Sequence, residues 1–470
     1  MNTTDSRGGA RRWWVFYAIA AATFLPALGF HYVGEEAIFA ISSLEMWYGG
    51  EWLQQIFLGG NLQHNPLFNW LIIPFASLAG WEHVLAVARA VTIGATAATG
   101  LALAWLVKAL YRDTAFAAFA AVVYLTLADV FFYRGWLAYV DPLFGFFVAA
   151  AIACLWVACL RHSLVLLALA VAALTCAFMS KAYTAYVFYG VAAVVLCCDR
   201  QNRAFLLGPG AWALHVLAAA APAAWLGLVP ANVGQSERMF VEILAKLAPE
   251  SLAEYASKVV AYPLETALKL MPALAAAAYY FWKQRGAARG RLATPERTAL
   301  IIALVNYLPY WLAPHSHTRY LTPLYPFFAL VVARVIWLAG AHAVRVTQHG
   351  IVVVIALKLV VMLIAFPYYQ RHYRGENYAV AARDIQTRAA GQPLYTTNVS
   401  ASGLSVVAHL DIVRLPQPPL TFPPARWDSG FVISYQPDPG VGPIAARYRL
   451  GGNDLYLLCR GAACDAGSGK

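Results

Sequence analysis

The chain has 470 residues, of which 61% are apolar and 12% are charged. Because a soluble globular protein has about 25% charged and roughly 45–50% apolar residues, this composition excludes an ordinary soluble domain and predicts a membrane protein. The net charge of +11 does not indicate a nucleic-acid partner, since the lysines and arginines lie in short segments between apolar stretches and form no single basic stripe.

Long apolar stretches recur along the first three quarters of the chain. A helix needs about 20 residues to cross the roughly 30 Å of hydrocarbon, so we predict an all-α polytopic membrane domain with about eleven spans, in a range of ten to thirteen. The basic start of the chain is also typical of a signal peptide, but the many later stretches favour an uncleaved signal anchor. The predicted spans are 12–30, 83–107, 114–132, 142–160, 163–179, 183–198, 204–229, 263–282, 297–313, 320–339 and 350–367.

Two further apolar segments are shorter and lie in the first predicted outer loop. The segment "EEAIFAISSLEMW" predicts an amphipathic helix at the interface, and 66–80 predicts a helix that lies at the interface or dips into it. Alternate loops are rich in Lys and Arg, which assigns that side to the cytoplasm. We therefore expect the segments on the opposite, outer face to be 31–82, 133–141, 180–182, 231–262, 314–319 and everything after about 368.

The last hundred residues are polar and rich in proline, and they predict a second domain. We expect residues 1–367 to form the membrane domain and 368–470 a small periplasmic α/β domain. Its predicted elements are a helix in "NYAVAARDIQTRAA" and strands in "PLYTTN", "DIVRL", "FVISYQ" and "RYRLGGNDLYLLC", the last turned at Gly451 and Gly452. Cys459 and Cys464 can pair only if this tail faces an oxidising compartment.

Ionisable side chains gather at the predicted outer face. Such groups near a membrane boundary are functional candidates, because burying them is costly unless they are paired. They are Glu35, Glu36, Arg134, Asp141, Lys181, His315, His317 and Arg319. Tyr183 follows Lys181 and carries a hydroxyl that can donate a hydrogen bond to an anion.

Each candidate also has a structural interpretation. Asp141 precedes Pro142 and can act as a helix N-cap. Glu35 and Glu36 can stabilise the start of a helix, although two carboxylates exceed what a cap requires. Lys181 can extend its ammonium group to the interface. A divalent metal at His315 and His317 is a further alternative, but their spacing is not specific.

Carboxylates beside cations on the outer face suit glycosyl transfer from a lipid-phosphate sugar. A carboxylate removes the proton of the acceptor hydroxyl, and Lys or Arg neutralises the phosphate leaving group. Because the membrane holds the polyprenyl tail, no nucleotide fold is needed, and the chain has no glycine-rich phosphate loop. No cofactor is expected, with a divalent metal as the open alternative.

The motifs that carry these residues resemble those of the GT-C fold polyprenyl-phosphate-sugar glycosyltransferases, in the protein O-mannosyltransferase-like superfamily that includes the lipid A aminoarabinose transferases. In "GEEAIFAISSLEMWYGGEWLQQIFLGGNLQHNPLFNW", the acidic pair, "GEW" and "HNP" are similar to the first motif of that superfamily. "YVDPLFGFF" resembles its second acidic motif, "LTCAFMSKAYTAYVF" its lysine stretch, and "HTRYLTPLYPFFAL" its "R-Y-x-L-P-L-Y-P". The matching residues are Glu35, Glu36, Gly50, Glu51, Trp52, His64, Asn65, Pro66, Asp141, Lys181, Arg319, Tyr320, Pro323, Tyr325 and Pro326.

The sequence departs from the family pattern at three positions. Glu35 stands where Asp is usual, Asn65 where Lys is found, and Ile38 where the aminoarabinose transferases have Arg. Two phosphate-binding cations are thereby replaced. The resemblance implies either that Lys181, Arg319 and Arg134 bind the phosphate, or that a divergent branch uses a different donor.

We predict an inverting glycosyltransferase that moves a sugar from undecaprenyl phosphate to a lipid, glycan or protein acceptor on the periplasmic face of the bacterial inner membrane. Membrane lipids are the other expected partners. Its predicted catalytic residues are Glu35 as base, Glu36 and Asp141. The predicted substrate-binding residues are His64, Asn65, Arg134, Lys181, Tyr183, His317, Arg319, Tyr320 and Tyr325. The alternatives are a glycolipid transporter or flippase, and a nonenzymatic scaffold. Charges at one face and the absence of sequence repeats favour the enzyme.

Overall fold

The computed structural model describes residues 3–61, 64–181, 183–229, 251–283, 293–372, 377–397, 399–450 and 453–467. The chain divides into two compact units. The first, which we name the helical unit, comprises Met1–Leu25, Thr92–Trp136 and Val140–Leu359. The second, the α/β unit, comprises Pro26–Val91, Leu137–Tyr139 and Val360–Lys470.

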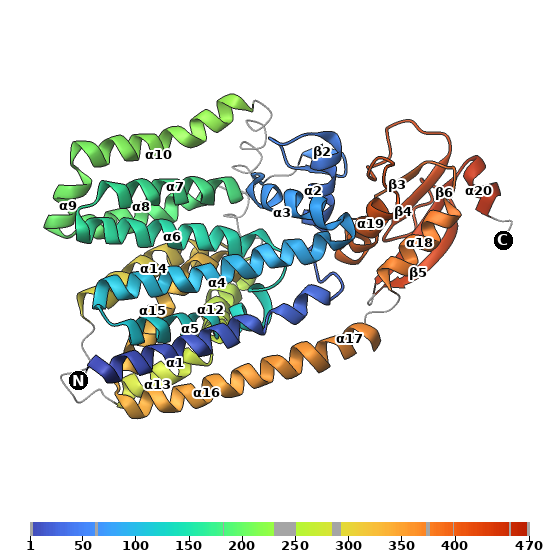
Figure 1. Cartoon of the computed structure of the whole chain (residues 1–470). Coiled ribbons are helices and arrows are strands. Elements are labelled where there is room, and N and C mark those ends of the chain that lie inside the picture. The colour runs from blue at the N-terminus through green and yellow to red at the C-terminus, as the bar shows by residue number, and fades with distance from the viewer. Residues whose placement is uncertain are drawn as a thin grey trace. The chain divides into compact units, whose positions relative to one another are not determined.

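The helical unit consists of long helices joined by short turns. Within it α6 packs on α7 and α8, α1 packs on α5, and α15 packs on α5, α13 and α14 (Figure 1). Its elements are α1 (Thr3–Ala22), the greater part of α4 (Val84–Tyr111), α5 (Thr114–Leu125), the π-helical turn η3 (Asp129–Arg134), α6 (Val140–Arg161), α7 (Leu164–Ser180), α8 (Thr184–Cys197), α9 (Arg200–Leu206), α10 (Pro209–Leu228), α12 (Leu252–Lys269), α13 (Ala273–Lys283), α14 (Thr294–Leu312), the 3-10 turn η5 (Thr318–Leu324), α15 (Tyr325–Leu338) and α16 (Ala341–Val360).

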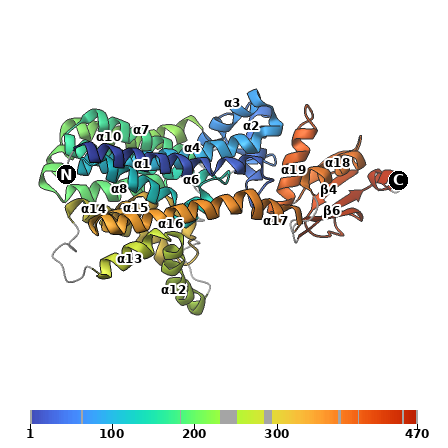
Figure 2. The ribbon, with the colours of Figure 1, turned by 60° about the horizontal axis from the view of Figure 1, so that its bottom comes forward.

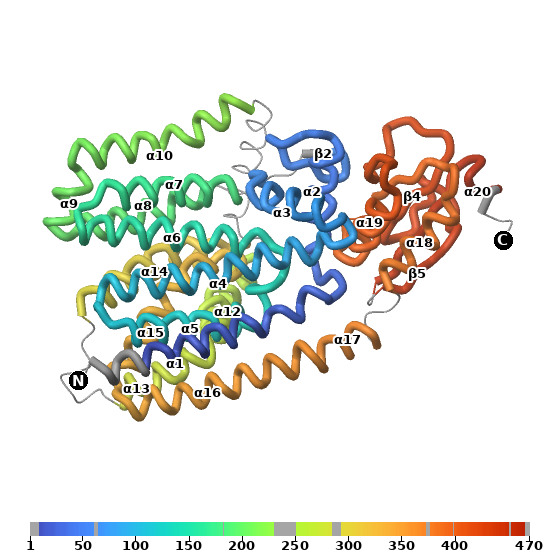
Figure 3. Tube along the Cα trace, viewed as in Figure 1, coloured from blue at the N-terminus to red at the C-terminus, as the bar shows by residue number. Residues whose placement is uncertain are grey.

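Local sequence signals set the turns between these helices. Asp113 caps α5, because its Oδ1 accepts hydrogen bonds from the N–H groups of Ala115 at 2.9 Å and Phe116 at 3.0 Å. His162 has a positive φ of 48° and Ser163 caps α7, so the chain reverses directly after α6. The tube in Figure 3 follows α7 back alongside α6. The start of α6 and the end of α7 therefore lie at the same end of this helix pair.

Five helices of the described ranges are long and apolar enough to cross a membrane. They are Trp81–Tyr111, Val140–Arg161, Pro209–Leu228, Thr318–Leu338 and Ala341–His372. Every predicted span overlaps a helix, whereas the count of eleven stays a prediction.

One predicted span, 263–282, is wrong as a continuous helix. The structure breaks it into α12 and α13, which are bent by 96° relative to each other (Figure 2). Helix α13 packs on α15, and α12 contacts α14. Pro272 lies at the break and lacks the backbone N–H that a continuous helix needs.

The α/β unit combines the first predicted outer loop with the C-terminal residues. Helix α2 packs on α3 and on α19, and α19 packs on α18. The predicted domain boundary after residue 367 does not describe this unit, because the unit also contains residues 26–91. The unit contains most of η1 (Leu25–Gly29), α2 (Ala37–Gly49), β1 (Ile56–Phe57), β2 (Gly60–Asn61), α3 (Leu67–Ala79), η2 (Trp81–His83), η6 (Val361–Ala365), α17 (Phe366–His372), α18 (Tyr378–Arg388), β3 (Leu394–Thr396), α19 (Ala401–Val413), β4 (Gly430–Ser434), β5 (Ile444–Leu450), β6 (Asn453–Arg460) and α20 (Ala462–Gly467).

A four-stranded sheet in the order β3-β4-β6-β5 forms the C-terminal part. β3 and β4 are parallel and the other pairs are antiparallel. The predicted helix over 377–390 and four of the predicted strands are confirmed, and both predicted helices of the first outer loop form as α2 and α3. The predicted turn at Gly451 and Gly452 lies outside the described residues.

The strand predicted at "DIVRL" is wrong, because Asp411 to Val413 are the last turn of α19. That helix begins at the N-cap Ser400, whose hydroxyl accepts a hydrogen bond from the Gly403 N–H. The β-branched run continues a buried helical stretch, so its local preference for a strand is overridden by packing.

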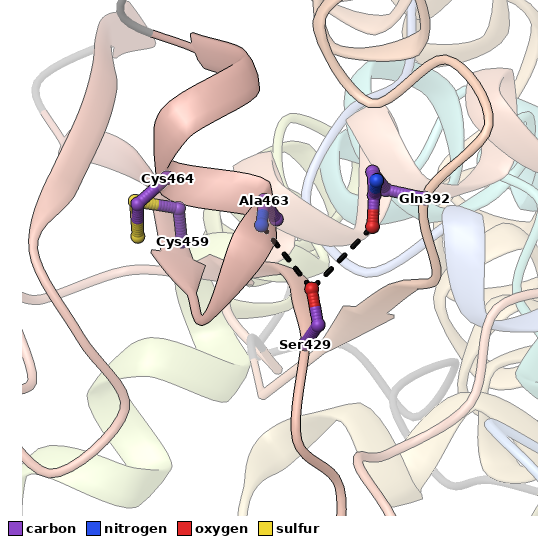
Figure 4. The surroundings of a disulfide bond; sticks show 5 residues. All are labelled: Gln392, Ser429, Cys459, Ala463 and Cys464. Atoms are coloured by element: carbon purple, nitrogen blue, oxygen red, sulfur yellow. Dashed lines mark hydrogen bonds between the residues drawn. A yellow bond between two sulfur atoms is a disulfide. The ribbon is translucent and has the colours of Figure 1, made fainter.

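A disulfide joins Cys459 at the end of β6 to Cys464 in α20 (Figure 4). Ser429 holds the same corner, because its hydroxyl accepts from the Ala463 N–H at 3.2 Å and donates to Gln392 Oε1 at 3.4 Å. The last helix is thus tied to the sheet covalently and by hydrogen bonds.

Candidate functional site

The two adjacent glutamates of the first outer loop have different environments. Glu36 is completely buried and forms an ion pair with Arg89, whose Nε donates to Oε1 at 2.8 Å and whose Nη2 donates to Oε2 at 2.5 Å. The Val33 and Ala138 N–H groups each donate to this carboxylate at 2.7 Å. Both oxygens of Glu36 are therefore saturated by donors within the α/β unit.

Glu35 is exposed, in contrast to its neighbour. Its backbone N–H donates to the Tyr139 hydroxyl at 3.1 Å. Gly34 precedes it with a φ of 59°, and an added Cβ at that position lies 2.5 Å from the Tyr139 oxygen. The left-handed turn at Gly34 brings the backbone against Tyr139, and of the two glutamates that follow it only Glu35 is accessible.

In the helical unit, Asp141 and Lys181 form a salt bridge. Asp141 is the second residue of α6 and Lys181 directly follows α7, and their side chains are only 12% and 14% exposed. The Lys181 Nζ donates to Asp141 Oδ1. The structure thus brings together two predicted site residues that are 40 positions apart.

Two arginines add positive charge near the Asp141–Lys181 pair. Arg134 and Arg319 both lie within electrostatic range of the Asp141 carboxylate. The Lys181 Nζ also lies 5.0 Å from the centre of the Tyr320 ring, and the Arg319 guanidinium lies 5.3 Å from it. One cation therefore contacts this carboxylate and two more lie within its electrostatic range, so a positive charge remains that can balance an anion. We name Arg134, Asp141, Lys181, Arg319 and Tyr320 the cation cluster.

Close packing positions the segment that carries Arg319. Turn η5 packs against α6 at Gly145, where an added Cβ would lie only 3.2 Å from the Thr322 methyl group. On its other side, Thr318 interacts with both partners of the Lys269–Glu265 ion pair, whose atoms Nζ and Oε1 are 2.8 Å apart. These contacts hold η5 between α6 and α12.

Arg134 has its own carboxylate partner, Asp129, which no motif of the sequence indicated. Its Nε lies 3.3 Å from Asp129 Oδ2, and the Tyr325 hydroxyl donates to the same oxygen at 2.8 Å. Tyr325 is a predicted site residue and is fully buried. The structure therefore assigns Tyr325 to a network with Asp129 and Arg134.

The other predicted binding residues are distributed over both units. His64 and Asn65 precede α3 in the α/β unit and are half-buried, as is Tyr183 after Lys181 in the helical unit. The His317 ring lies 6.3 Å from the Tyr320 ring and its carbonyl accepts from the Tyr262 hydroxyl. In the part of the chain that the structure describes, no three His, Cys, Asp or Glu side chains gather as metal ligands, so metal binding at His315 and His317 stays a prediction.

Two buried carboxyl groups lie where α2 and α19 pack in the α/β unit. Glu45 Oε1 accepts from the Leu58 N–H at 2.8 Å, and burial nevertheless raises its pKa to about 7. Burial also raises the pKa of Asp411 well above its ordinary value, although its Oδ1 accepts from the Leu420 N–H at 2.8 Å. The nearby charge of Glu45 adds to this rise. His409 on the same helix has a pKa lowered to about 4 by burial.

The chain shares its fold with two crystal structures of ArnT from Cupriavidus metallidurans. The structure bound to undecaprenyl phosphate matches with a TM-score of 0.70 and 12% identity, over 96% of this chain and 98% of that one. The apo structure matches with a TM-score of 0.68 and 15% identity, over 97% and 99%. No protein-family model and no curated protein matches the sequence. The predicted GT-C fold of a multi-pass membrane protein is confirmed.

Proposed function

We propose that the chain is an inverting glycosyltransferase that moves a sugar from an undecaprenyl-phosphate donor to an acceptor at the periplasmic face of the bacterial inner membrane. The observation that carries the proposal is the cation cluster, in which Lys181 is paired with Asp141 and two arginines lie within electrostatic range. It occurs in the fold of ArnT, which was crystallised with undecaprenyl phosphate.

The proposed reaction is a single displacement. Glu35 accepts the proton of the acceptor hydroxyl, and the oxygen attacks the anomeric carbon while the bond from that carbon to the phosphate oxygen breaks. Undecaprenyl phosphate leaves with the electron pair, and inversion follows from attack opposite to the leaving group. The base role of Glu35 is supported by its exposure and by the family resemblance.

The cations stabilise the leaving phosphate. Cations fixed in a largely buried site stabilise developing negative charge far more than cations in water. Before the donor binds, Asp141 balances Lys181, so the cluster does not leave an uncompensated buried charge. We propose that the donor phosphate competes with Asp141 for Lys181. Arg134 and Arg319 then supply the additional positive charge.

Glu36 serves a structural role in this proposal. Four hydrogen bonds occupy its carboxylate, which leaves it poorly suited to accept a proton from a substrate. The periplasmic assignment is supported by the positive-inside bias and by the Cys459–Cys464 disulfide, since disulfides persist in oxidising compartments.

Purified protein in lipid nanodiscs, supplied with lipid-linked sugars extracted from bacterial membranes, tests the proposal. Mass spectrometry should detect undecaprenyl phosphate released by the wild type together with glycosylated acceptor. Glu35→Gln and Lys181→Gln should each reduce release by about 100-fold or more. Glu82→Gln, at an exposed carboxylate of the same outer segment, is the matched control and should retain full activity.

Absence of release from every lipid-linked sugar would contradict the proposal, whereas transbilayer movement of an intact glycolipid would favour a flippase. Full activity of folded Glu35→Gln would reject the base assignment alone. Comparing glycolipids, polysaccharides and glycoproteins of cells with and without the protein identifies the sugar and the acceptor.

A further inference from the structure

We propose that Asp129 and Tyr325 are positioning residues that hold Arg134 with its terminal amino groups directed to the phosphate of the lipid-linked donor. This inference rests on the proposed function and adds two residues to it. Asp129 and Arg134 are the first and last residues of the π-helical turn η3.

The π-helical turn makes the Asp129–Arg134 pair possible. The two residues are five positions apart, and in an α-helix that spacing would separate their side chains by about 140° around the axis. A π-helix is wider and forms i to i+5 hydrogen bonds, so residues five apart share nearly the same face. Such turns are frequent at functional sites. The π-helical conformation of η3 therefore places Asp129 and Arg134 in contact.

The contact is an ion pair at the Nε side of the guanidinium and not a hydrogen bond. Asp129 Oδ2 lies 3.3 Å from Nε of Arg134, and the Asp129 and Arg134 side chains are 4% and 13% exposed. Within the described ranges, the terminal Nη1 and Nη2 groups form no hydrogen bond with protein. An arginine presents a rigid planar fork of donors that fits a phosphate, so an ion pair at the Nε side restricts where the terminal donors lie.

Tyr325 fixes the carboxylate in turn. Its hydroxyl donates to the same Asp129 oxygen at 2.8 Å, and it is the first residue of α15, directly after the turn that carries Arg319. The hydrogen bond therefore connects the segment of Arg134 with the segment of Arg319. Both arginines lie within electrostatic range of Asp141, so the network sets the spacing of two phosphate ligands.

A purely structural role explains these contacts less well. A buried ion pair is weak evidence for stability, because desolvation offsets most of the attraction. Arg134 in addition lies within electrostatic range of Asp141 in the cation cluster, a position that a purely structural pair does not need. The matched comparison is the Glu296–Arg334 pair of the same unit, where Nε lies 2.7 Å from a fully buried carboxylate.

The test measures binding of two lipids to the full-length protein in nanodiscs. Undecaprenyl phosphate and neutral undecaprenol share the same tail and differ in the phosphate alone. Asp129→Asn and Arg134→Gln should each weaken undecaprenyl phosphate binding by about tenfold, the effect of one charge-assisted hydrogen bond, and Tyr325→Phe by about threefold. Undecaprenol binding should be unchanged in all three. Glu296→Gln should leave the binding of both lipids unchanged.

The double variant Asp129→Asn/Arg134→Gln should bind undecaprenyl phosphate no more weakly than Arg134→Gln alone, because Asp129 acts through Arg134. The inference is overturned if Asp129→Asn binds undecaprenyl phosphate like the wild type. It is equally overturned if undecaprenol binding falls in parallel, since a structural defect affects both lipids. If Asp129→Asn does not fold, Tyr325→Phe replaces it in the test. The inference is then overturned if Tyr325→Phe binds undecaprenyl phosphate like the wild type, or if its binding of undecaprenol falls in parallel. A wild type that does not prefer undecaprenyl phosphate over undecaprenol contradicts the proposed function itself.

Discussion

Arg89 and Glu36 form an ion pair in which neither side chain is accessible to solvent. The guanidinium also donates to three carbonyl oxygens, those of Ala27 at 2.6 Å, Phe30 at 2.7 Å and His31 at 2.9 Å. Together with the N–H groups that Glu36 binds, this pair fixes the backbone on both sides of Glu35. A buried charge pair therefore determines where the proposed catalytic base is held.

Loss of either partner of this pair should destabilise the protein strongly. Glu36→Ala leaves the Arg89 charge buried without a counterion, and such a loss costs about 3–5 kcal/mol. Arg89→Met should cost a similar amount, and combining the two substitutions should cost less than their sum. Thermal unfolding in detergent measures these differences. Glu35→Gln is the control and should unfold at the wild-type temperature, because its carboxylate is exposed. A stable Glu36→Ala variant would contradict the structural assignment.

Asp141→Asn should separate phosphate binding from catalysis. Removing the Asp141 charge frees Lys181 from its partner, so undecaprenyl phosphate should bind more tightly, by on the order of fivefold. Transfer should nevertheless fall, because product release slows and the carboxylate is absent. Equilibrium binding and turnover, measured on the same preparation, test both effects. Lys181→Gln serves as the counterpart and should weaken binding. Weaker binding by Asp141→Asn would show that this carboxylate does not compete with the phosphate.

Much of the fold follows from local sequence, since apolar runs of about 20 residues must form helices in lipid. The candidate site can be predicted from local sequence less completely than the fold. Asp141 and Lys181 were predictable as separate residues at the ends of two spans, but their pairing depends on the reversal at His162. Arg89 and Asp129 were missed, although an ionisable residue within an apolar run is itself a signal.

The partners of these missed residues come from distant segments. Glu36 lies 53 positions from Arg89, and Tyr325 lies 196 positions from Asp129. No local periodicity encodes such pairs, and only tertiary packing brings them together. The same limit explains the strand predicted at 411–415, where burial in α19 overrides the local β-branched pattern.

The disulfide provides a test of orientation as well as of stability. Five of the seven cysteines have free thiols in the structure, and Cys459 and Cys464 are joined. Denatured protein from membranes should therefore take up five alkyl groups without reductant and seven after reduction. Because the loop is short, Cys459→Ser/Cys464→Ser should lose about 2 kcal/mol of stability. Seven labels without reductant would place the tail in a reducing compartment.

The buried carboxyl groups of α2 and α19 should contribute stability that is lost as pH rises, whereas buried His409, whose pKa is lowered to about 4, should contribute stability that is gained between about pH 4 and 6.5. The unfolded chain ionises Glu45 near its ordinary pKa of 4.5, whereas the folded protein keeps it protonated up to about 7. Between these values the folded state binds more protons, so its stability decreases with pH, by a total of about 3 kcal/mol for Glu45. Asp411 changes stability in the same direction, since its pKa is also raised by burial.

Because His409 opposes the carboxyl groups up to about pH 6.5, thermal unfolding from pH 4.5 to 8 is compared between the wild type and Asp411→Asn, and a net decline of the wild-type midpoint is expected above about pH 6.5. Asp411→Asn keeps the acceptor for the Leu420 N–H and removes one titrating group, so it should flatten the decline and raise the midpoint at pH 8. Glu254→Gln, at an exposed glutamate in α12, is the control and should preserve the wild-type profile. An Asp411→Asn variant that is less stable than the wild type at pH 8 would mean that this carboxylate is ionised and paired in the folded state, because only then does its charge stabilise the protein.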